Sequence, residues 1–345
     1  MTDRLELGID TFGDVTVGRD GQTLSQAQVL RNVIAEAELA EQVGVDCFGV
    51  GEHHRADFAV SAPETILAAI ATRTRKMWLG SAVTVLSTDD PVRVFQRFST
   101  LNAVSNGRAE VILGRGSFTE SYPLFGYDLE NYNELFEEKL DLFVKLLGNG
   151  PVTWRGESRS PLENQLVYPP IETGTLRTWV GVGGSPESVV RAARHGLPLT
   201  LAIIGGNPIR FRPYVELYHQ SLERFGKSPQ PIAVHSPGHV APTDEQAREE
   251  LWPHYAAMMT RIGAERGWPP VDRSHFEREA GPAGALCVGS PDTVATKIAN
   301  TIKTLGLARF DMKYSAGTLP HETMLRSIEL FGTKVAPQIR DRIST

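Results

Sequence analysis

Short apolar runs alternate along the chain with longer segments in which apolar positions recur at helical spacing. The first run covers residues 5–12, and in the next segment, residues 25–43, Val29, Val33 and Ala37 share one helical face. Apolar runs without polar alternation are typical of strands buried on both faces of a parallel sheet. The predicted strands are residues 5–12, 46–50, 77–86, 109–113, 178–183, 199–204, 231–240 and 309–314. The predicted helices are residues 25–43, 63–75, 91–105, 130–147, 186–195, 209–225, one beginning at 243, 290–305 and 321–335.

Eight strands alternating with helices, with no change of composition between the halves of the chain, predict one closed (β/α)8 barrel, a TIM barrel, over residues 1–345. Two segments depart from the alternation. Residues 151–177 suit a hairpin and a proline-rich connector, and residues 266–286 suit an insertion or lid. The competing architecture is an open doubly wound sheet. Its Gly-x-Gly-x-x-Gly fingerprint is missing, because the glycines of residues 8–21 have a different spacing.

The second predicted helix carries a start signal of its own. Ser61-Ala62-Pro63-Glu64 matches a capping box with a proline in the first turn, where no N–H partner is needed. We therefore expect Ser61 to cap this helix.

Composition narrows the class of protein. Hydrophobic residues make up 41% of the chain, enough for a large core, and no apolar run approaches the roughly 20 residues of a membrane helix. The first residues lack the apolar core of a signal peptide, and two cysteines, Cys47 and Cys287, exclude a disulfide framework. A cytoplasmic location is the simplest expectation. The formal charge of -6, without a basic run, argues against a nucleic-acid or anionic-membrane surface.

The first candidate site follows the second strand, as Glu52-His53-His54. In parallel barrels, chemistry is placed at the carboxyl ends of the strands. Because side chains alternate along a strand, we expect one histidine to face the barrel mouth and the other to pack outward against a loop. An imidazole titrates near neutral pH and can hold or pass a proton. The alternative is a pair of structural histidines.

The second candidate site is Gly114-Arg115-Gly116-Ser117, after the fourth strand. An arginine between glycines can present its guanidinium to a phosphate while the backbone approaches a flat ligand closely. The alternative is an ordinary turn with an exposed arginine.

The third candidate site is Gly183-Gly184-Ser185, with Ser188 one turn further along the following helix. Two hydroxyls and free N–H groups would converge on the positive end of that helix, as in a phosphate-binding site. The alternative is a plain capped helix, in which Glu187 already complements the dipole.

Two further possibilities rank lower. Gly289-Ser290-Pro291-Asp292 has the same capped-helix pattern and is a rival phosphate site. A metal site would need His235 and His239 together with the histidines of the first site, but no pair has a recognised zinc spacing. We predict no metal ligand.

The chain resembles the bacterial luciferase-like family of flavin-dependent oxidoreductases over nearly its whole length. The motifs that carry the resemblance are Glu52-His53-His54, residues 79–86 with Pro91, residues 101–108, Gly114-Arg115-Gly116, Gly183-Gly184-Ser185, residues 192–196, residues 330–332 and Pro337. Their order and spacing together are specific to the family, although none is decisive alone.

The resemblance implies a barrel that binds FMN across its mouth. Arg115, Ser185 and Ser188 would hold the phosphate, and the Ala82–Val83 bond, often a cis peptide in the family, would lie against the flavin ring. His53 would stand beside the reactive face of the ring. Together, the motifs and the resemblance assign catalysis to His53 and Glu52, and cofactor binding to Ala82, Val83, Gly114, Arg115, Gly116, Ser117, Gly183, Gly184, Ser185 and Ser188.

The sequence also departs from the luciferases proper. Asp90 precedes Pro91 where the luciferase catalytic subunit has a histidine, and Ser117-Phe118 replaces a leucine-tyrosine pair. Neither light emission nor a long-chain aldehyde substrate is therefore expected.

The leading functional hypothesis is a monooxygenase that uses reduced FMN and O2 on a small organic substrate. A separate NAD(P)H-dependent reductase would supply the reduced flavin, since the chain has no dinucleotide fingerprint of its own. The alternatives are a deazaflavin-dependent dehydrogenase, a flavin-binding protein without turnover and, more distantly, a metal-dependent hydrolase. The resemblance also implies a homodimer through the second and third helices.

Overall fold

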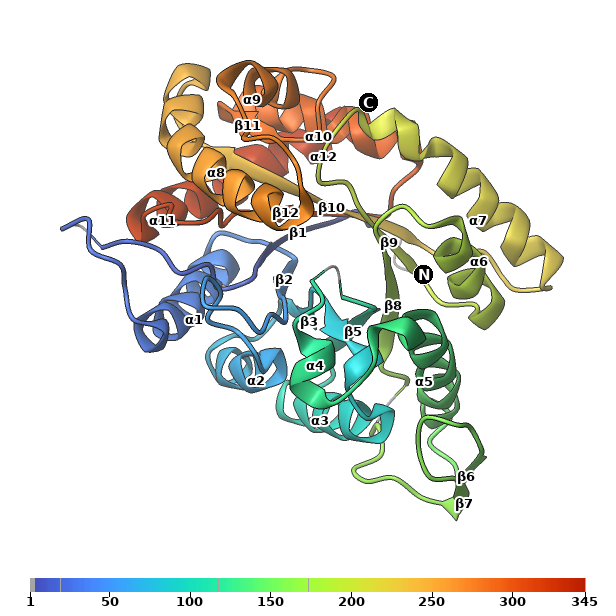
Figure 1. Ribbon diagram of the computed structural model, residues 1–345. Coiled ribbons are helices and arrows are strands. Elements are labelled where there is room, and N and C mark those ends of the chain that lie inside the picture. The colour runs from blue at the N-terminus through green and yellow to red at the C-terminus, as the bar shows by residue number, and fades with distance from the viewer. Residues whose placement is uncertain (1–3, 19, 117, 173, 345) are drawn as a thin grey trace.

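The computed structural model describes residues 4–18, 20–116, 118–172 and 174–344. Eight parallel strand positions form a closed barrel (Figure 1), in the order β10-β12-β1-β2-β3-β5-β8-β9, and the pairing of β9 with β10 closes it. The predicted TIM barrel is confirmed. Its strands are β1 (Glu6–Thr11), β2 (Cys47–Val50), β3 (Trp78–Ser81) with β4 (Thr84–Val85), β5 (Ala109–Gly114), β8 (Arg177–Val182), β9 (Leu199–Ala202), β10 (Ile232–Val240) and β12 (Arg309–Lys313).

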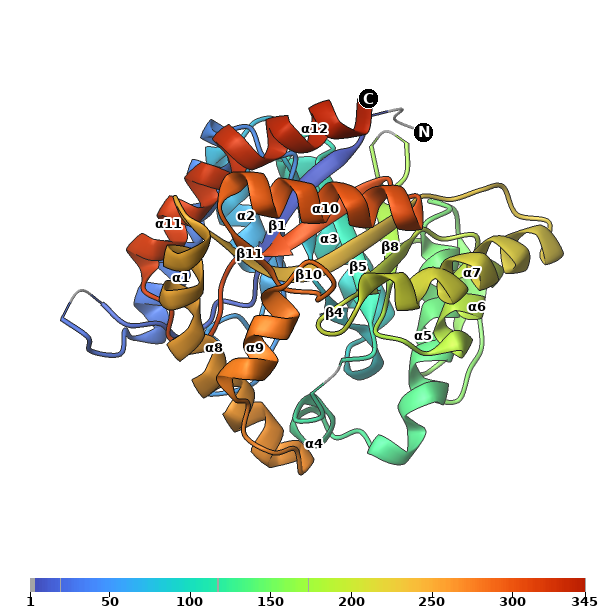
Figure 2. The ribbon, with the colours of Figure 1, turned by 90° about the horizontal axis from the view of Figure 1, so that it is seen from above.

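Helices surround the barrel, and α4 and the distal half of α8 extend beyond the same end of it (Figure 2). The helices are α1 (Gln26–Gln42), α2 (Pro63–Arg73), α3 (Pro91–Val104), α4 (Ser121–Phe125), α5 (Tyr132–Leu146), α6 (Pro186–His195), α7 (Arg212–Arg224), α8 (Asp244–Arg266), α9 (Arg273–Ala280), α10 (Pro291–Leu305), α11 (His321–Leu330) and α12 (Ala336–Ser344). No helix within the described ranges is long and apolar enough to cross a membrane.

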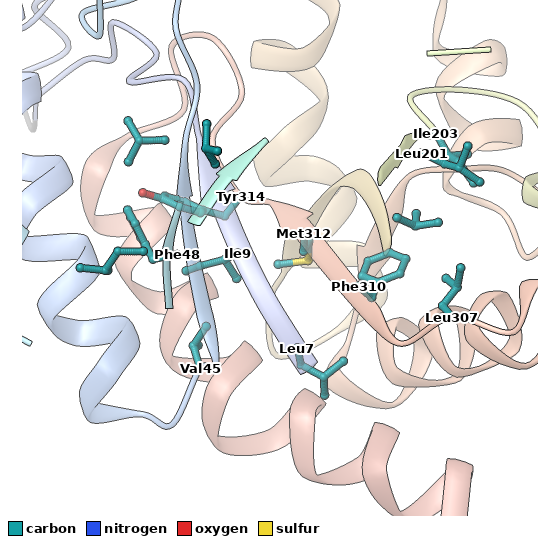
Figure 3. Packing of buried hydrophobic residues seen from close by; sticks show 14 of the residues in the cluster. Leu7, Ile9, Val45, Phe48, Leu201, Ile203, Leu307, Phe310, Met312 and Tyr314 are labelled. Carbon is teal, nitrogen blue, oxygen red and sulfur yellow. The ribbon is translucent and has the colours of Figure 1, made fainter. Parts of the chain in front are cut away.

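The apolar core lies between the strands and the helix layer. Leu7 and Ile9 on β1, with Phe310 on β12, are fully or almost fully buried there (Figure 3). Because side chains alternate along a strand, their neighbours Glu6 and Asp10 point into the barrel. The strands therefore bury apolar side chains outside the barrel, and within it they place charged side chains together with a small apolar cluster of Ile112, Trp179 and Ala233.

A charged network fills the lower part of the barrel. Arg309 is only 2% exposed, and its Nε lies 2.7 Å from Oδ2 of Asp311 while Nη1 pairs with Glu110. The indole of Trp179 donates to Glu110 over 3.3 Å. Arg309, Glu110 and Asp311 in this network thus each have a partner of opposite sign, as a low-dielectric interior requires.

The predicted strand at residues 77–86 is interrupted. β3 ends at Ser81, a cis peptide joins Ala82 to Val83, and β4 is followed by a short 3-10 helix at Leu86–Thr88. Apolar periodicity runs through this break, so the sequence pattern merged its parts into one strand.

The predicted capping box of α2 is wrong. The N-cap is Ala62, which makes no side-chain cap, because Pro63 occupies the first helical position. Ser61 therefore lies one residue too early to cap the helix, and Glu64 pairs with Arg97 instead.

The two predicted insertions have different structures. Residues 151–177 contain the expected hairpin, β6 (Val152–Trp154) with β7 (Leu162–Gln165), which projects away from the barrel (Figure 1). Residues 266–286 are more helical than predicted, because α9 lies within them. Just beyond them, the short strand β11 (Cys287–Gly289) pairs with β10. Helices α4 and α12 were also not predicted.

Candidate active site

A cavity of about 580 Å³ lies at the carboxyl ends of the barrel strands. This volume is within the usual range for small-molecule sites. The predicted residues that line it are Glu52, His53, Ala82, Val83, Gly114, Arg115, Gly116, Gly183, Gly184 and Ser185. The three strand-end motifs therefore share one cavity. Ser117 lies outside the described residues, and Ser188 is buried beside the cavity without lining it.

His53 is surrounded by aromatic rings. Its imidazole stacks on Phe58 at 4.5 Å between centroids and contacts Phe12 at 4.6 Å and Phe118, edge on, at 5.1 Å. Burial lowers the pKa of His53 to about 3, against the weaker raising effect of Asp14. The side chain is therefore neutral at pH 7, and it can donate or accept a hydrogen bond without carrying a charge.

Glu52 holds neighbouring groups in place. One carboxylate oxygen accepts the Val85 N–H at 2.8 Å, and the other lies 2.8 Å from Nε2 of His54. His54 in turn packs edge on against Phe125 of α4 at 5.0 Å. Its packing against an α4 side chain fits the expected outward histidine, although His54 also lines part of the cavity. Because both oxygens are engaged, we interpret Glu52 as a positioning residue, and its catalytic role stays a prediction.

Val83 projects between two glycines of neighbouring strands. A Cβ added at Gly114 would lie 2.5 Å from Cγ2 of Val83, and one added at Gly181 would lie 3.0 Å from its Cγ1. Real Cβ atoms essentially never come as close as the contact at Gly114, and the contact at Gly181 is tighter than most. Gly114 thus makes room for Val83, and its part in cofactor binding stays a prediction.

Arg115 is held by the segment that follows it. Its guanidinium lies over the Tyr132 ring, 4.8 Å from the centroid, and donates to Oδ1 of Asn133 at 2.7 Å. The Tyr132 hydroxyl donates to the Gly116 carbonyl at 2.9 Å, and the Tyr122 hydroxyl donates to the Arg115 carbonyl at 3.2 Å. These contacts fix Arg115 and Gly116 at the cavity wall.

The start of α6 has the predicted capped geometry. Ser185 is the N-cap and its Oγ accepts the Ser188 N–H, with Pro186 in the first turn. The Ser185 hydroxyl also donates to Glu187 at 2.7 Å. A bound phosphate would compete with this carboxylate, while the free N–H groups and the helix dipole would favour the anion. The phosphate contacts of Ser185 and Ser188 stay predictions.

Arg191 is a cation near this helix start that the sequence motifs did not reveal. It is 8% exposed, donates to Oγ of Ser188 at 3.1 Å and pairs with Glu137. Its place one turn after Ser188 on α6 is a spacing signal that the prediction did not use. Arg191 positions Ser188 and adds positive charge behind the helix start.

Arg55 links three segments at the cavity mouth through ion pairs and a contact with an aromatic ring. Arg55, after β2, donates to Asp57 at 3.1 Å and to Glu265 at the end of α8 at 2.8 Å. Its guanidinium also lies 4.7 Å from the centroid of Phe118, after β5. The expected lid segment, residues 266–286, starts at the last residue of α8, directly after Glu265.

The cavity suits a flavin in two further respects. Oγ1 of Thr200, which lines the cavity, is buried and has no hydrogen-bond partner among the described residues. At Gly183, an added Cβ would meet nothing within 4 Å, so the backbone there is open to a close ligand. An uncommitted buried hydroxyl and an open glycine fit a flat, polar-edged ring system.

The low-ranked alternative of a metal site would have used His235 and His239 with the histidines of the first site. Within the described part of the chain, no three or more histidine, cysteine or acidic side chains could hold a metal ion. His235 bonds to Asp10 at 2.7 Å, and His239 bonds to Glu250 at 2.8 Å. Cys47 and Cys287 are both free and buried.

Comparison with known proteins places this site in a family context. The family model for luciferase-like monooxygenases matches residues 11–309. The alkanal monooxygenase alpha chain of Photorhabdus luminescens is 28% identical over 62% of this chain and 59% of its own length. The chain spans about half to three fifths of the length of the first two curated relatives that it matches.

Solved structures with the same fold bind one of two cofactors, FMN or F420. The oxygenating constituent of 3,6-diketocamphane monooxygenase from Pseudomonas putida, in complex with FMN, has a TM-score of 0.77 at 19% identity, over 97% of this chain and 99% of that one. An F420-dependent secondary alcohol dehydrogenase in complex with an F420-acetone adduct has a TM-score of 0.74 at 18% identity, over 98% of this chain and 100% of that one. At these identities, the likeness establishes the barrel alone.

Proposed function

The chain belongs to the luciferase-like monooxygenase family, and we propose on this basis that it uses reduced FMN and O2 to oxygenate a small organic substrate. A separate NAD(P)H-dependent reductase would supply the reduced flavin. The observation that carries the proposal is the cavity itself, which joins Arg115 and the start of α6 to His53. An anion site and a neutral imidazole in one cavity suit a ligand with a phosphate tail and a reactive ring.

Different residues of the chain would contact the two ends of this ligand, the phosphate and the ring. Arg115 and the N–H groups at the start of α6 would hold the phosphate, and Gly183 would let the backbone approach the ligand. Reduced FMN supplies the electrons for the reaction with O2 when it is bound. His53 would hold or pass a proton beside the ring, and the rings of Phe12, Phe58 and Phe118 would keep water away from it.

The test is the reaction of reduced FMN with O2 in the presence of the full chain. Photoreduced FMN is mixed with the protein under anaerobic conditions and then with oxygenated buffer, and the flavin absorbance is followed by stopped flow. We expect the time course to differ from that of free reduced FMN. An identical time course, with no FMN bound to the protein, would contradict the proposal.

His53→Ala separates a catalyst from a flavin-binding protein without turnover. We expect this variant to bind FMN while the reaction with O2 slows by about 100-fold or more, as is typical when a proton-transfer group is lost. His219→Ala, at an exposed position on α7, is the matched control. A His53→Ala time course equal to that of the control would favour the binding protein.

The second candidate is a dehydrogenase that uses the deazaflavin F420, and it is favoured by the fold shared with the F420-dependent alcohol dehydrogenase. Both cofactors have a flat ring and a phosphate, so one site can accept either. Parallel titrations with FMN and with F420 decide between them, because the tighter ligand identifies the cofactor.

A further inference from the structure

A histidine–aspartate pair, His235 with Asp10, lies in the wall of the cavity, and its members come from the strands on either side of β12. Nδ1 of His235 on β10 lies 2.7 Å from Oδ2 of Asp10 on β1. Both residues line the cavity. The two are 225 positions apart in the sequence, and the pairing of β12 with both β1 and β10 brings them together.

The hydrogen bond fixes which ring nitrogen faces the ligand. Asp10 is 1% exposed, and its carboxylate can only accept, so Nδ1 of His235 carries the proton. No hydrogen bond from the described residues engages Nε2 of His235, and Oδ1 of Asp10 is likewise buried without a partner. This arrangement leaves Nε2 with its lone pair available, backed by a carboxylate, as in a general base.

The pair lies near the reactive end of the cavity, on the same side as His53. Phe12 stands between the two imidazoles, 4.6 Å from His53 and stacked at 5.9 Å on His235, with 9° between the planes. The cavity lining also includes large apolar and aromatic side chains, among them Tyr255, Met258 and Trp268. A flat apolar molecule with one polar group would place that group against His235.

We propose that the Asp10–His235 pair binds an acidic hydroxyl, a phenol or enol, on a ring-shaped substrate and removes its proton. The inference rests on the proposed function and adds the substrate class. The O–H bond breaks, its electron pair stays on the substrate oxygen, and the proton forms a bond with Nε2. The resulting imidazolium is balanced by the Asp10 carboxylate. The ring of the deprotonated substrate is richer in electrons, and it therefore accepts an oxygen atom more readily.

The neighbouring charges on β12 are already paired. Nζ of Lys313 lies 3.0 Å from Oδ2 of Asp14, and Asp311 pairs with Arg309. Burial raises the pKa of Asp311 to about 6; Arg309 opposes this, and the Asp10 carboxylate adds to it. Asp10 is therefore the charged group in direct contact with His235.

The experiment uses 4-nitrophenol as probe, because its phenolate absorbs visible light and its phenol does not. The flavin-free full chain is saturated with the probe at one fixed pH, and the phenolate-to-phenol ratio of the bound probe is read from the spectrum. His235→Asn keeps a donor towards Asp10 but removes the base, and Asp10→Asn keeps the shape but removes the charge. His219→Asn on α7 is the matched control, and circular dichroism verifies that each variant is folded.

We expect the wild type and the control to bind the probe mainly as phenolate. The ratio should fall about 10-fold or more in His235→Asn and in Asp10→Asn. Equal ratios in the wild type and His235→Asn, or no binding of the probe to the wild type, would overturn the inference. A ratio that falls in His235→Asn alone would overturn the role of the Asp10 carboxylate.

FMN titration of the same proteins separates this inference from the proposed function. A chain that binds FMN but does not ionise the probe refutes only the substrate class. A chain that ionises the probe but binds no FMN refutes the flavin-dependent function.

Discussion

At the scale of single residues, the site depends on an imidazole that stays neutral. His53 is enclosed by Phe12, Phe58 and Phe118, and burial lowers its pKa to about 3. An ordinary histidine would be partly charged just below neutral pH. A neutral ring can donate or accept a hydrogen bond beside a ligand without bringing a charge into an apolar cavity.

The lowered pKa of His53 predicts how stability depends on pH. Between its ordinary value of 6.5 and about 3, the unfolded chain binds a proton that the folded chain does not. Folding stability from this group is therefore present above pH 6.5 and is lost as the pH falls, by about 1.4 kcal/mol per pH unit. His53→Gln removes the effect, so the variant should gain about 1 kcal/mol on the wild type between pH 6 and pH 5.

Urea unfolding of the wild type, His53→Gln and the exposed control His219→Gln at the two pH values measures this difference. The control should follow the wild type. If His53→Gln also follows the wild type, His53 is protonated in the folded protein at these pH values, and its role as a neutral group is wrong.

At the scale of elements, the interruption between β3 and β4 shapes the cavity wall. Ala82 and Val83 line the cavity, and Gly114 on β5 and Gly181 on β8 accept the Val83 side chain. Glu52 ties β4 to the loop after β2 through the Val85 N–H. Parts of four neighbouring strand positions, β2, β3 with β4, β5 and β8, are thus fitted to one another around the segment that the resemblance places against the flavin.

Two glycine substitutions should affect different properties, one the folding stability and the other the FMN affinity. Gly114→Ala places a Cβ 2.5 Å from Cγ2 of Val83 and should cost about 1–3 kcal/mol of folding stability. Gly183→Ala meets no atom within 4 Å and should leave stability within about 0.5 kcal/mol, but should weaken FMN binding by filling space next to the ligand.

Chemical denaturation and FMN titration of both variants test this contrast, with Gly150→Ala as a control whose nearest contact is 4.0 Å away. A Gly114→Ala variant as stable as the control would mean that Val83 is not confined by this glycine. Unchanged FMN affinity in Gly183→Ala would remove Gly183 from the binding site.

At the scale of the whole molecule, the charged network inside the barrel links strands that are far apart in the chain. Arg309 on β12 reaches Glu110 on β5, and Arg177 on β8 reaches Glu6 on β1 at 2.8 Å. The network closes the barrel below the cavity. Mutual pairing keeps these charges tolerable in the interior.

Loss of Arg309 should therefore be costly. Arg309→Met leaves Glu110 and Asp311 without their buried cation and should reduce the free energy of unfolding by about 3–5 kcal/mol. Arg212→Met removes an exposed arginine on α7 and should change it by less than about 0.5 kcal/mol. A loss below about 1 kcal/mol in Arg309→Met, measured by denaturant unfolding, would show that the network does not stabilise the barrel.

The sequence predicted the features of the molecule that are local in the chain. The order of strands and helices, the hairpin and the residues at three strand ends follow from periodicity and turn chemistry, and eight of the predicted site residues at those strand ends line one cavity. Contacts between distant segments were not predictable. Asp10 with His235 and Arg55 with Glu265 depend on which side chains the closed barrel turns inward. The cis peptide at Ala82–Val83 was expected from the resemblance alone. The break in the strand was missed, because apolar periodicity continues through it.

The oligomeric state belongs to the same scale. A homodimer through α2 and α3 stays a prediction from family resemblance, and Val104 at the end of α3 is 49% exposed. Light scattering of the wild type and of Val104→Glu tests it, since a charge in an apolar contact should shift a dimer towards monomer.

The central claim is that Arg115 and the start of α6 bind the phosphate of a flavin. Its most direct test compares FMN with riboflavin, which lacks the phosphate, in titrations of the wild type, Arg115→Ala and the exposed control Arg155→Ala. We predict that the wild type and the control bind FMN about 10- to 150-fold more tightly than riboflavin, and that Arg115→Ala loses most of this preference, as expected for a charge-assisted contact. Equal affinities for FMN and riboflavin in the wild type would contradict the claim.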